Sequence, residues 1–134
     1  IKPYHNDAVW PFVQAYWNLA AAKVKNMEAF TTGLGAIYRS AALFGTHKEL
    51  YVSSNGDYRG TAVNSDAQLW SATGSAAMIY RVIAGMEFGV DGIEFAPFVP
   101  AALTGDKTIS GFRYRDAMLN ITIKGTGDKV VSFT

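Results

Sequence analysis

The sequence predicts an α+β fold, with helices over roughly the first two thirds of the chain and antiparallel strands over the rest. Apolar residues recur at helical spacing as far as about residue 85, and beyond Met86 they alternate with polar residues. The 134 residues are 49% hydrophobic and 17% charged, a composition that can bury a core. We therefore expect about three helices in residues 1–89 and an antiparallel β domain in residues 90–134.

The first helix is expected over residues 9–25, a stretch without glycine. Its apolar side chains follow one another at steps of four and three: Phe12, Tyr16, Leu19. Pro11 is tolerated only in the first turn of a helix, where its missing N–H would have no intrahelical partner. The helix should therefore begin near Val9 and leave residues 5–7 on the loop that precedes it.

A second helix is expected over residues 27–44, and Gly45 is suited to cap its C-terminal end. Gly33 and Gly35 lie inside this helix and weaken it. We interpret both glycines as positions of close packing against a neighbouring helix.

A third helix is expected from Ser65 to about Gly85. Ser65 and Gln68 fit a capping box, in which Gln68 bonds back to the first residue of the helix. Residues 46–64 join the second and third helices without a sustained period. A connection of this length inside a compact domain often carries function.

The remaining chain predicts hairpins. Residues 90–93 read as a hairpin turn, residues 115–117 as a second turn and residues 125–128 as a third. Two half-buried strands are expected, because apolar residues alternate with polar ones. In the first strand, Phe112 and Tyr114 alternate with Arg113 and Arg115. In the second strand, Leu119, Ile121 and Ile123 alternate with Asn120, Thr122 and Lys124. Residues 130–134 should begin a further strand, and a chain that stops within a strand is interpreted as a piece of a longer protein.

Composition argues against several classes of function. A net charge of +1 without a basic run disfavours binding to nucleic acid or to a membrane surface. There is no cysteine, and the two histidines, His5 and His47, have no metal-ligand spacing around them, so no metal or cofactor is expected. No apolar run reaches the roughly 20 residues that a membrane span requires.

The most informative segment is residues 4–11, Tyr-His-Asn-Asp-Ala-Val-Trp-Pro. It resembles the Tyr-His-Asn-Gly-x-Val-Trp-Pro segment of glycogen-debranching-type glucosidases, with Asp7 in place of the glycine. Residues 68–72, Gln-Leu-Trp-Ser-Ala, resemble the Gln-x-Trp-Ser-Ala that opens the last barrel helix in those enzymes. Residues 95–100 and 112–115 are similar to the β-sandwich that follows the barrel in maltose-phosphorylase-like and rhamnosidase-like enzymes.

This resemblance implies the C-terminal part of a six-hairpin glycosidase, namely the last helices of an (α/α)6 barrel and the start of a β-sandwich. Such an enzyme would be exo-acting, of bacterial type, and would hydrolyse α-linked sugars with inversion, using two carboxyl groups. Glu49 lies about 20 residues before Trp70, as the catalytic base does in the processing-glucosidase and trehalase relatives. The catalytic acid would lie upstream of residue 1, so the isolated chain should be inactive.

The resemblance also implies a binding site for an oligosaccharide or glycoside. His5, Asn6 and Asp7 would bind sugar hydroxyls, and Trp10 or Trp70 would offer an apolar face to the ring. Each of these residues has a structural interpretation as well: a satisfied histidine at position 5 or a helix cap at position 7.

Other interpretations stay open for the remaining candidates. Glu49 could be a solvated loop residue, and Asp57 and Asp66 are alternative bases. The tryptophans share a core interpretation, which is the usual one for large aromatic residues: Trp10, Trp17 and Trp70.

Two alternative functions remain. A glycoside phosphorylase would use phosphate in place of the activated water and would need an anion pocket, which no cluster of Lys, Arg, Ser or Gly indicates. A non-enzymatic helical interaction module would leave Glu49 dispensable. In each case we expect exposed apolar faces, covered by the remainder of a parent enzyme or by a second copy.

Overall fold

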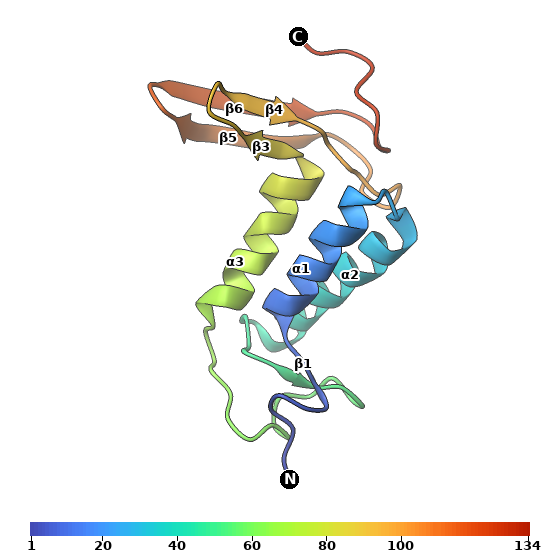
Figure 1. The fold of residues 1–134 in the computed structure, drawn as a ribbon, viewed down its shortest axis with the longest axis vertical. Coiled ribbons are helices and arrows are strands. Elements are labelled where there is room, and N and C mark those ends of the chain that lie inside the picture. The colour runs from blue at the N-terminus through green and yellow to red at the C-terminus, as the bar shows by residue number, and fades with distance from the viewer.

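The computed structural model describes residues 1–134 and confirms the α+β class. Its elements, in chain order, are β1 (Ala8–Val9), α1 (Pro11–Lys23), α2 (Met27–Phe44), β2 (Tyr51–Val52), α3 (Leu69–Ala77), the π-helix η1 (Met78–Ile83), β3 (Met86–Phe88), β4 (Ile93–Phe95), β5 (Lys107–Tyr114) and β6 (Ala117–Ile123). The helices form the middle of the molecule, with β3–β6 at one end and β1 and β2 at the other (Figure 1).

Helix α1 begins at Pro11, so the expected start near Val9 is wrong by two residues. Trp10 has an extended backbone, with φ −105° and ψ 116°, because a residue that precedes proline is sterically kept out of the helical region. Ala8–Val9 instead forms strand β1 and pairs antiparallel with Tyr51–Val52. The segment before α1 is thereby tied to the long connection between α2 and α3.

Helix α2 has the predicted bounds, Met27–Phe44. Gly45 adopts the left-handed conformation, with φ 66°, which confirms its capping role. A Cβ atom at Gly33 would overlap Asn18 of α1, which confirms close packing at that position. The same interpretation is wrong for Gly35, where a Cβ atom would meet only the flexible Arg39 side chain of its own helix.

Helix α3 begins at Leu69, and the predicted capping box is wrong. Gln68 occupies the N-cap position but makes no side-chain cap hydrogen bond. The backbone N–H of Ser65 instead donates to Glu49 Oε2 at 3.0 Å. A tertiary partner has therefore taken the group that a local cap would have used. The helical stretch continues through η1 to Ile83, close to the predicted end.

The chain after η1 turns back and closes the end of the helix. Gly85 has φ 61°, and a Cβ atom there would overlap the backbone of Ala96. The N–H of Ala96 donates to the Gly85 carbonyl at 2.8 Å, and the N–H of Phe98 donates to the Val82 carbonyl at 2.9 Å. The bond to Val82 satisfies a carbonyl group that the last turn of the helix leaves unpaired, and both bonds join the helices to the strand end.

The main core lies between the helices and the segment that follows β4. Its ten buried members are Ala15, Ala21, Phe30, Leu34, Ile37, Met78, Val82, Ile83, Phe98 and Val99. The rings of Phe30 and Phe98 meet edge to face, with centroids 5.5 Å apart. Phe98 and Val99 thus carry the strand end into the helical core.

The strands form three separate antiparallel pairs, β1–β2, β3–β4 and β5–β6. The predicted turns at 90–93 and 115–117 are confirmed. The apolar residues of the predicted alternation are half-buried in β5 and β6: Phe112, Tyr114, Leu119, Ile121 and Ile123. The expected strand at 130–134 is wrong, because no neighbouring strand pairs with this stretch. The change from helix to strand falls between Ile83 and Met86, and the domain boundary near residue 89 stays a prediction.

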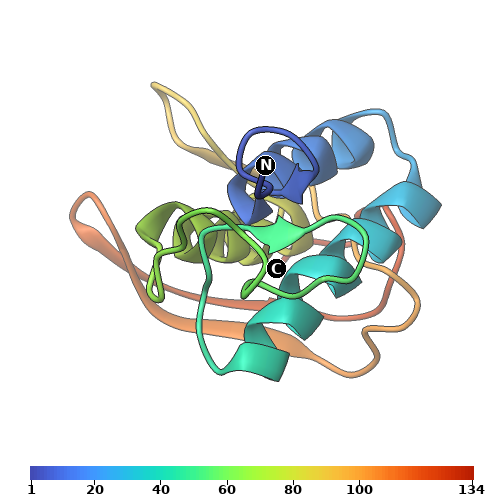
Figure 2. The same ribbon diagram turned by 90° about the horizontal axis from the view of Figure 1, so that it is seen from below.

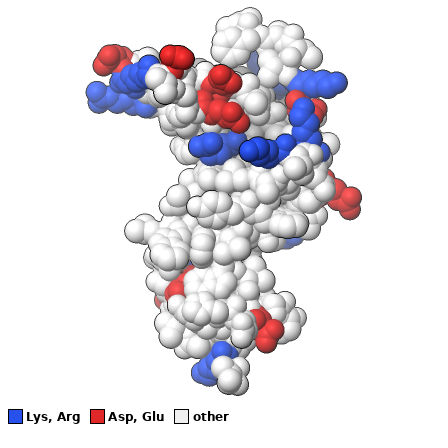
Figure 3. Space-filling model, in the orientation of Figure 1, with Lys and Arg blue, Asp and Glu red and all other residues white.

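Large apolar side chains remain exposed, as predicted. On the helices they include Tyr16, Trp17, Leu43, Leu69 and Trp70, each more than half exposed. Figure 3 shows an almost uncharged band across the middle of the molecule, whereas the charged residues gather over the strand end. No helix has the length and apolar character needed to cross a membrane.

Candidate functional site

The candidate site lies at the end of the helices opposite β3–β6. Here the N-terminal segment meets residues 46–66, and Figure 2 looks onto the two segments side by side. The N–H of Ser53 donates to the Asp7 carbonyl at 3.0 Å, and the N–H of Ala62 donates to the Pro3 carbonyl at 3.0 Å. Backbone pairing therefore brings the sequence motif at 4–11 and Glu49 to one place.

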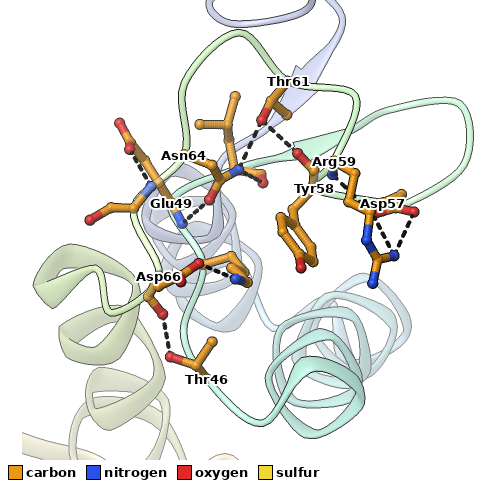
Figure 4. Close-up of polar contacts among 11 residues, drawn as sticks. Thr46, Glu49, Asp57, Tyr58, Arg59, Thr61, Asn64 and Asp66 are labelled. Carbon is orange, nitrogen blue, oxygen red and sulfur yellow. Dashed lines mark hydrogen bonds and ion pairs between the residues drawn. The ribbon is translucent and has the colours of Figure 1, made fainter.

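Glu49 lies at the centre of this contact and is only 9% exposed. Its Oε1 accepts a hydrogen bond from the Tyr4 hydroxyl at 3.2 Å, and its Oε2 accepts from the Ser65 N–H at 3.0 Å. Its own N–H donates to the Ser65 carbonyl and to Asn64 Oδ1, each at 3.1 Å (Figure 4). The interpretation of Glu49 as a solvated loop residue is therefore wrong.

Asn64 organises the connection around Glu49. Besides accepting from the Glu49 N–H, its Nδ2 donates to the Leu50 carbonyl at 2.7 Å and to Thr61 Oγ1 at 3.1 Å. An irregular connection of this kind needs such side-chain bonds, since few of its backbone groups pair in regular ladders. The position of Glu49 is consequently set by its neighbours in space.

Tyr4 was not predicted from the sequence as a site residue, although it is the first residue of the motif at 4–11. Its ring meets His5 and Trp10 edge to face, with centroid distances of 4.7 and 5.2 Å. Trp10 Nε1 donates to the Tyr4 carbonyl at 3.0 Å. Desolvation of the hydroxyl, and then the hydrogen bond to the Glu49 carboxylate and its negative charge, raise the pKa of Tyr4.

An aromatic arc, formed by His5, Tyr4, Trp10, Phe12 and Trp70, extends from this point to α3. The rings of His5 and Trp10 are nearly parallel, at 14°, with centroids 6.1 Å apart. Phe12 contacts Trp10 at 5.8 Å and Trp70 at 5.0 Å. The sequence-predicted His5, Trp10 and Trp70 therefore belong to one continuous row of rings.

The core interpretation of the tryptophans is wrong for two of them. Trp17 is 63% exposed and Trp70 is 57% exposed. Trp10 is partly buried by its neighbours in the aromatic arc.

Asn6 and Asp7 are exposed on the turn between His5 and β1. Asp7 has φ 55°, a left-handed conformation that glycine adopts freely and that Asp and Asn tolerate better than most residues. This requirement explains how aspartate can stand where the debranching-type segment has glycine. Asp7 is not a helix cap, because the N-cap position of α1 belongs to Trp10.

The two alternative carboxylates are paired with basic residues. Asp57 accepts from the Arg59 backbone N–H at 3.0 Å and forms an ion pair with its guanidinium at 3.2 Å. The Arg59 N–H, and then the guanidinium, lower the pKa of Asp57. Asp66 pairs with Lys48, whose Nζ lies 3.8 Å from the centroid of the Tyr58 ring (Figure 4).

A groove of about 520 Å³ continues from the aromatic arc between α1 and α3. Phe12 and Trp70 line the groove near the site, together with Tyr16, and Arg81 lies farther along, in η1. His47 lies apart from His5 and approaches Ser75, with 3.4 Å between Nδ1 and Oγ. No cluster of three His, Asp or Glu side chains could hold a metal ion.

Fold and site together define an α+β protein with a buried carboxylate beside a row of aromatic rings at one end of its helices. Comparisons of the chain with protein-family models, with curated proteins and with solved structures found no match.

Proposed function

We propose that the chain is part of a glycoside hydrolase that cleaves α-linked sugars, acting from a chain end and with inversion. The observation that carries the proposal is the contact between Tyr4 and Glu49, which puts a held carboxylate next to the aromatic arc. Inverting hydrolysis requires one carboxylic acid to protonate the leaving oxygen and one carboxylate to activate water. Glu49 is proposed as that base, and the acid would come from residues upstream of residue 1.

Glu49 has the chemical capacity for this role. A carboxylate offers about four lone-pair positions on its two oxygens. Tyr4 and the Ser65 N–H occupy one position on each oxygen, so both oxygens retain capacity to accept from a water molecule. Asp57 and Asp66 are weaker candidates, because each is already paired with a cation.

The aromatic arc supports a sugar as the ligand. A pyranose has apolar C–H faces that pack on aromatic rings, and its hydroxyls need directional polar partners. His5 and Trp10 present nearly parallel rings, and the exposed Asn6 and Asp7 lie on the same turn. Trp70 would contact a second ring of an oligosaccharide farther along the arc.

A glycoside phosphorylase is less well supported. It would require free cationic groups for phosphate, whereas Lys48 and Arg59, the cations of residues 46–66, are paired with Asp66 and Asp57. A helical interaction module is favoured only by the exposed apolar side chains of α1 and α3, such as Tyr16, Trp17, Leu69 and Trp70. On that alternative, Glu49 would contribute to stability alone.

The test is hydrolysis of aryl α-glycosides and α-linked disaccharides by the longest natural protein that contains residues 1–134. The Glu49→Gln variant should lose about 10³-fold or more in kcat, whereas Glu94→Gln, at an exposed position of β4, should keep wild-type activity. NMR of the first product formed should show the inverted anomer.

Other outcomes would redirect the proposal. Equal activity of wild type and Glu49→Gln would remove Glu49 as the base and direct attention to Asp57 and Asp66. A requirement for phosphate would indicate the phosphorylase. Absence of any cleavage across a broad panel, with and without phosphate, would favour the interaction module.

A further inference from the structure

We propose that Tyr4 is a positioning residue, whose hydroxyl holds Oε1 of Glu49 in the orientation that a general base requires. This inference rests on the proposed function and adds a residue to its site. The Tyr4 hydroxyl is the one side-chain donor to the Glu49 carboxylate, at 3.2 Å, and it comes from a segment 45 residues away in the sequence.

Two donors define the plane of the carboxylate. Ser65 N–H approaches Oε2 from the connection that leads to α3, and Tyr4 approaches Oε1 from the N-terminal segment. The last torsion of a glutamate side chain is broad and weakly restricted by its own sterics. If one donor is removed, the carboxylate plane can rotate about the hydrogen bond that remains. A base that activates water needs its carboxylate oxygen to point at that water.

Tyr4 is itself held at several points. Its ring lies edge to face against both His5 and Trp10, and its carbonyl accepts from Trp10 Nε1. The hydroxyl therefore cannot move independently of the aromatic arc. Tyr4 therefore sets the distance between the aromatic rings and the Glu49 carboxylate. Because the rings would hold the sugar and Glu49 would be the base, Tyr4 fixes the position of one relative to the other.

The kinetic test compares Tyr4→Phe with Tyr58→Phe in the longest natural protein that contains residues 1–134. Tyr4→Phe keeps the ring contacts and removes the hydroxyl, so kcat should fall about 10-fold while KM stays within about 2-fold. Tyr58 is a matched control in the same loop region, since its ring contacts Lys48 and Phe44 and its hydroxyl does not bond to Glu49, whose carboxylate accepts from Tyr4 and Ser65. Tyr58→Phe should leave kcat and KM unchanged.

Two kinetic results would overturn the inference. An unchanged kcat in Tyr4→Phe would show that the hydroxyl does not position the base. A raised KM with unchanged kcat would assign Tyr4 to sugar binding instead. A wild-type protein without activity on any glycoside would overturn the proposed function, and the role of Tyr4 would fall with it.

A second measurement separates the contact from the activity. NMR titration of the Tyr4 ring in the 134-residue chain should show a raised pKa, and Glu49→Gln should move that pKa toward the ordinary value by removing the charge. Asp57→Asn is the matched control, because it removes a carboxylate of the same loop region that pairs with Arg59, and it should leave the titration of Tyr4 unchanged. If Glu49→Gln also leaves that titration unchanged, the contact is absent and the inference fails even where the enzyme is active.

Discussion

The two ends of the molecule are built in opposite ways. At the loop end, residues 1–10 and 46–68, little structure is regular, yet side chains such as Asn64 and Glu49 bond groups far apart in the sequence. At the strand end, residues 85–134, the hairpins are regular apart from one register shift between Ile109 and Phe112, but beyond Met86 only residues 98–100 are buried. Strand β5 pairs with its immediate successor, β6.

The two ends differ in the kind of hydrogen bond that fixes the positions of their side chains. A hairpin satisfies its backbone groups locally, so its regularity says little about how firmly it is attached to the rest. The irregular loop end can be held only by specific long-range bonds, and those same bonds orient Glu49. The candidate site therefore lies in the less regular and more specifically bonded part of the chain.

The largest effect is expected at the junction of the two ends. Gly85→Ala would force a side chain into a left-handed conformation and into the backbone of Ala96. Overpacking and the unfavourable φ together should cost about 3 kcal/mol or more, measured by urea unfolding. Gly92→Ala, where nothing lies within 4 Å of the added atom, should stay within about 0.5 kcal/mol. Similar stability of both variants would contradict the close packing of Gly85 against Ala96.

A smaller effect is expected in the helices that join the two ends. Gly33→Ala should cost about 1–3 kcal/mol, because the new atom would overlap the fully buried Asn18. Gly35→Ala meets only the movable Arg39 side chain and should be neutral or stabilising by up to about 1 kcal/mol, since alanine favours helix. Thermal unfolding of both variants tests this, and equal destabilisation would argue against close packing specifically at Gly33.

A direct comparison of the two ends uses one polar side chain from each. Asn64→Ala should cost about 1 kcal/mol and speed hydrogen exchange at the Glu49 N–H, which loses its Asn64 acceptor. Thr108→Ala, which removes an exposed 3.5 Å contact to Thr122, should change stability by only a few tenths of that amount. If Thr108→Ala destabilised the protein as much as Asn64→Ala, the proposed difference between the two ends would be wrong.

The smallest effect is expected at alkaline pH. Burial raises the pKa of Tyr38 and Tyr51, and the pKa of Tyr4 shifts in the same direction, so the folded state holds these protons more tightly than the unfolded state does. Their contribution to stability is complete below about pH 10 and is lost as the pH rises through the folded-state values. Unfolding measured from pH 8 to 11 should show this loss, and Tyr38→Phe should reduce it.

Sequence patterns alone determined the elements that depend on neighbouring residues. The bounds of α2 followed from its period and from Gly45, and the alternation in β5 and β6 followed from period two. Such patterns are readable because each helix turn and each hairpin is stabilised largely within itself. The start of α1 was also readable to within two residues, since the restriction that Pro11 places on Trp10 is local.

Only the tertiary structure decided the roles of groups that have partners elsewhere. Ser65 carries a capping signal, yet its N–H bonds to Glu49, and Gly35 resembles Gly33 in sequence but faces no neighbouring helix. The contact of Tyr4 with Glu49 joins positions 45 residues apart, and no local pattern encodes it. A hydrogen bond forms wherever folding brings a donor to an acceptor, so the arrangement of the candidate site could be known only from the folded chain.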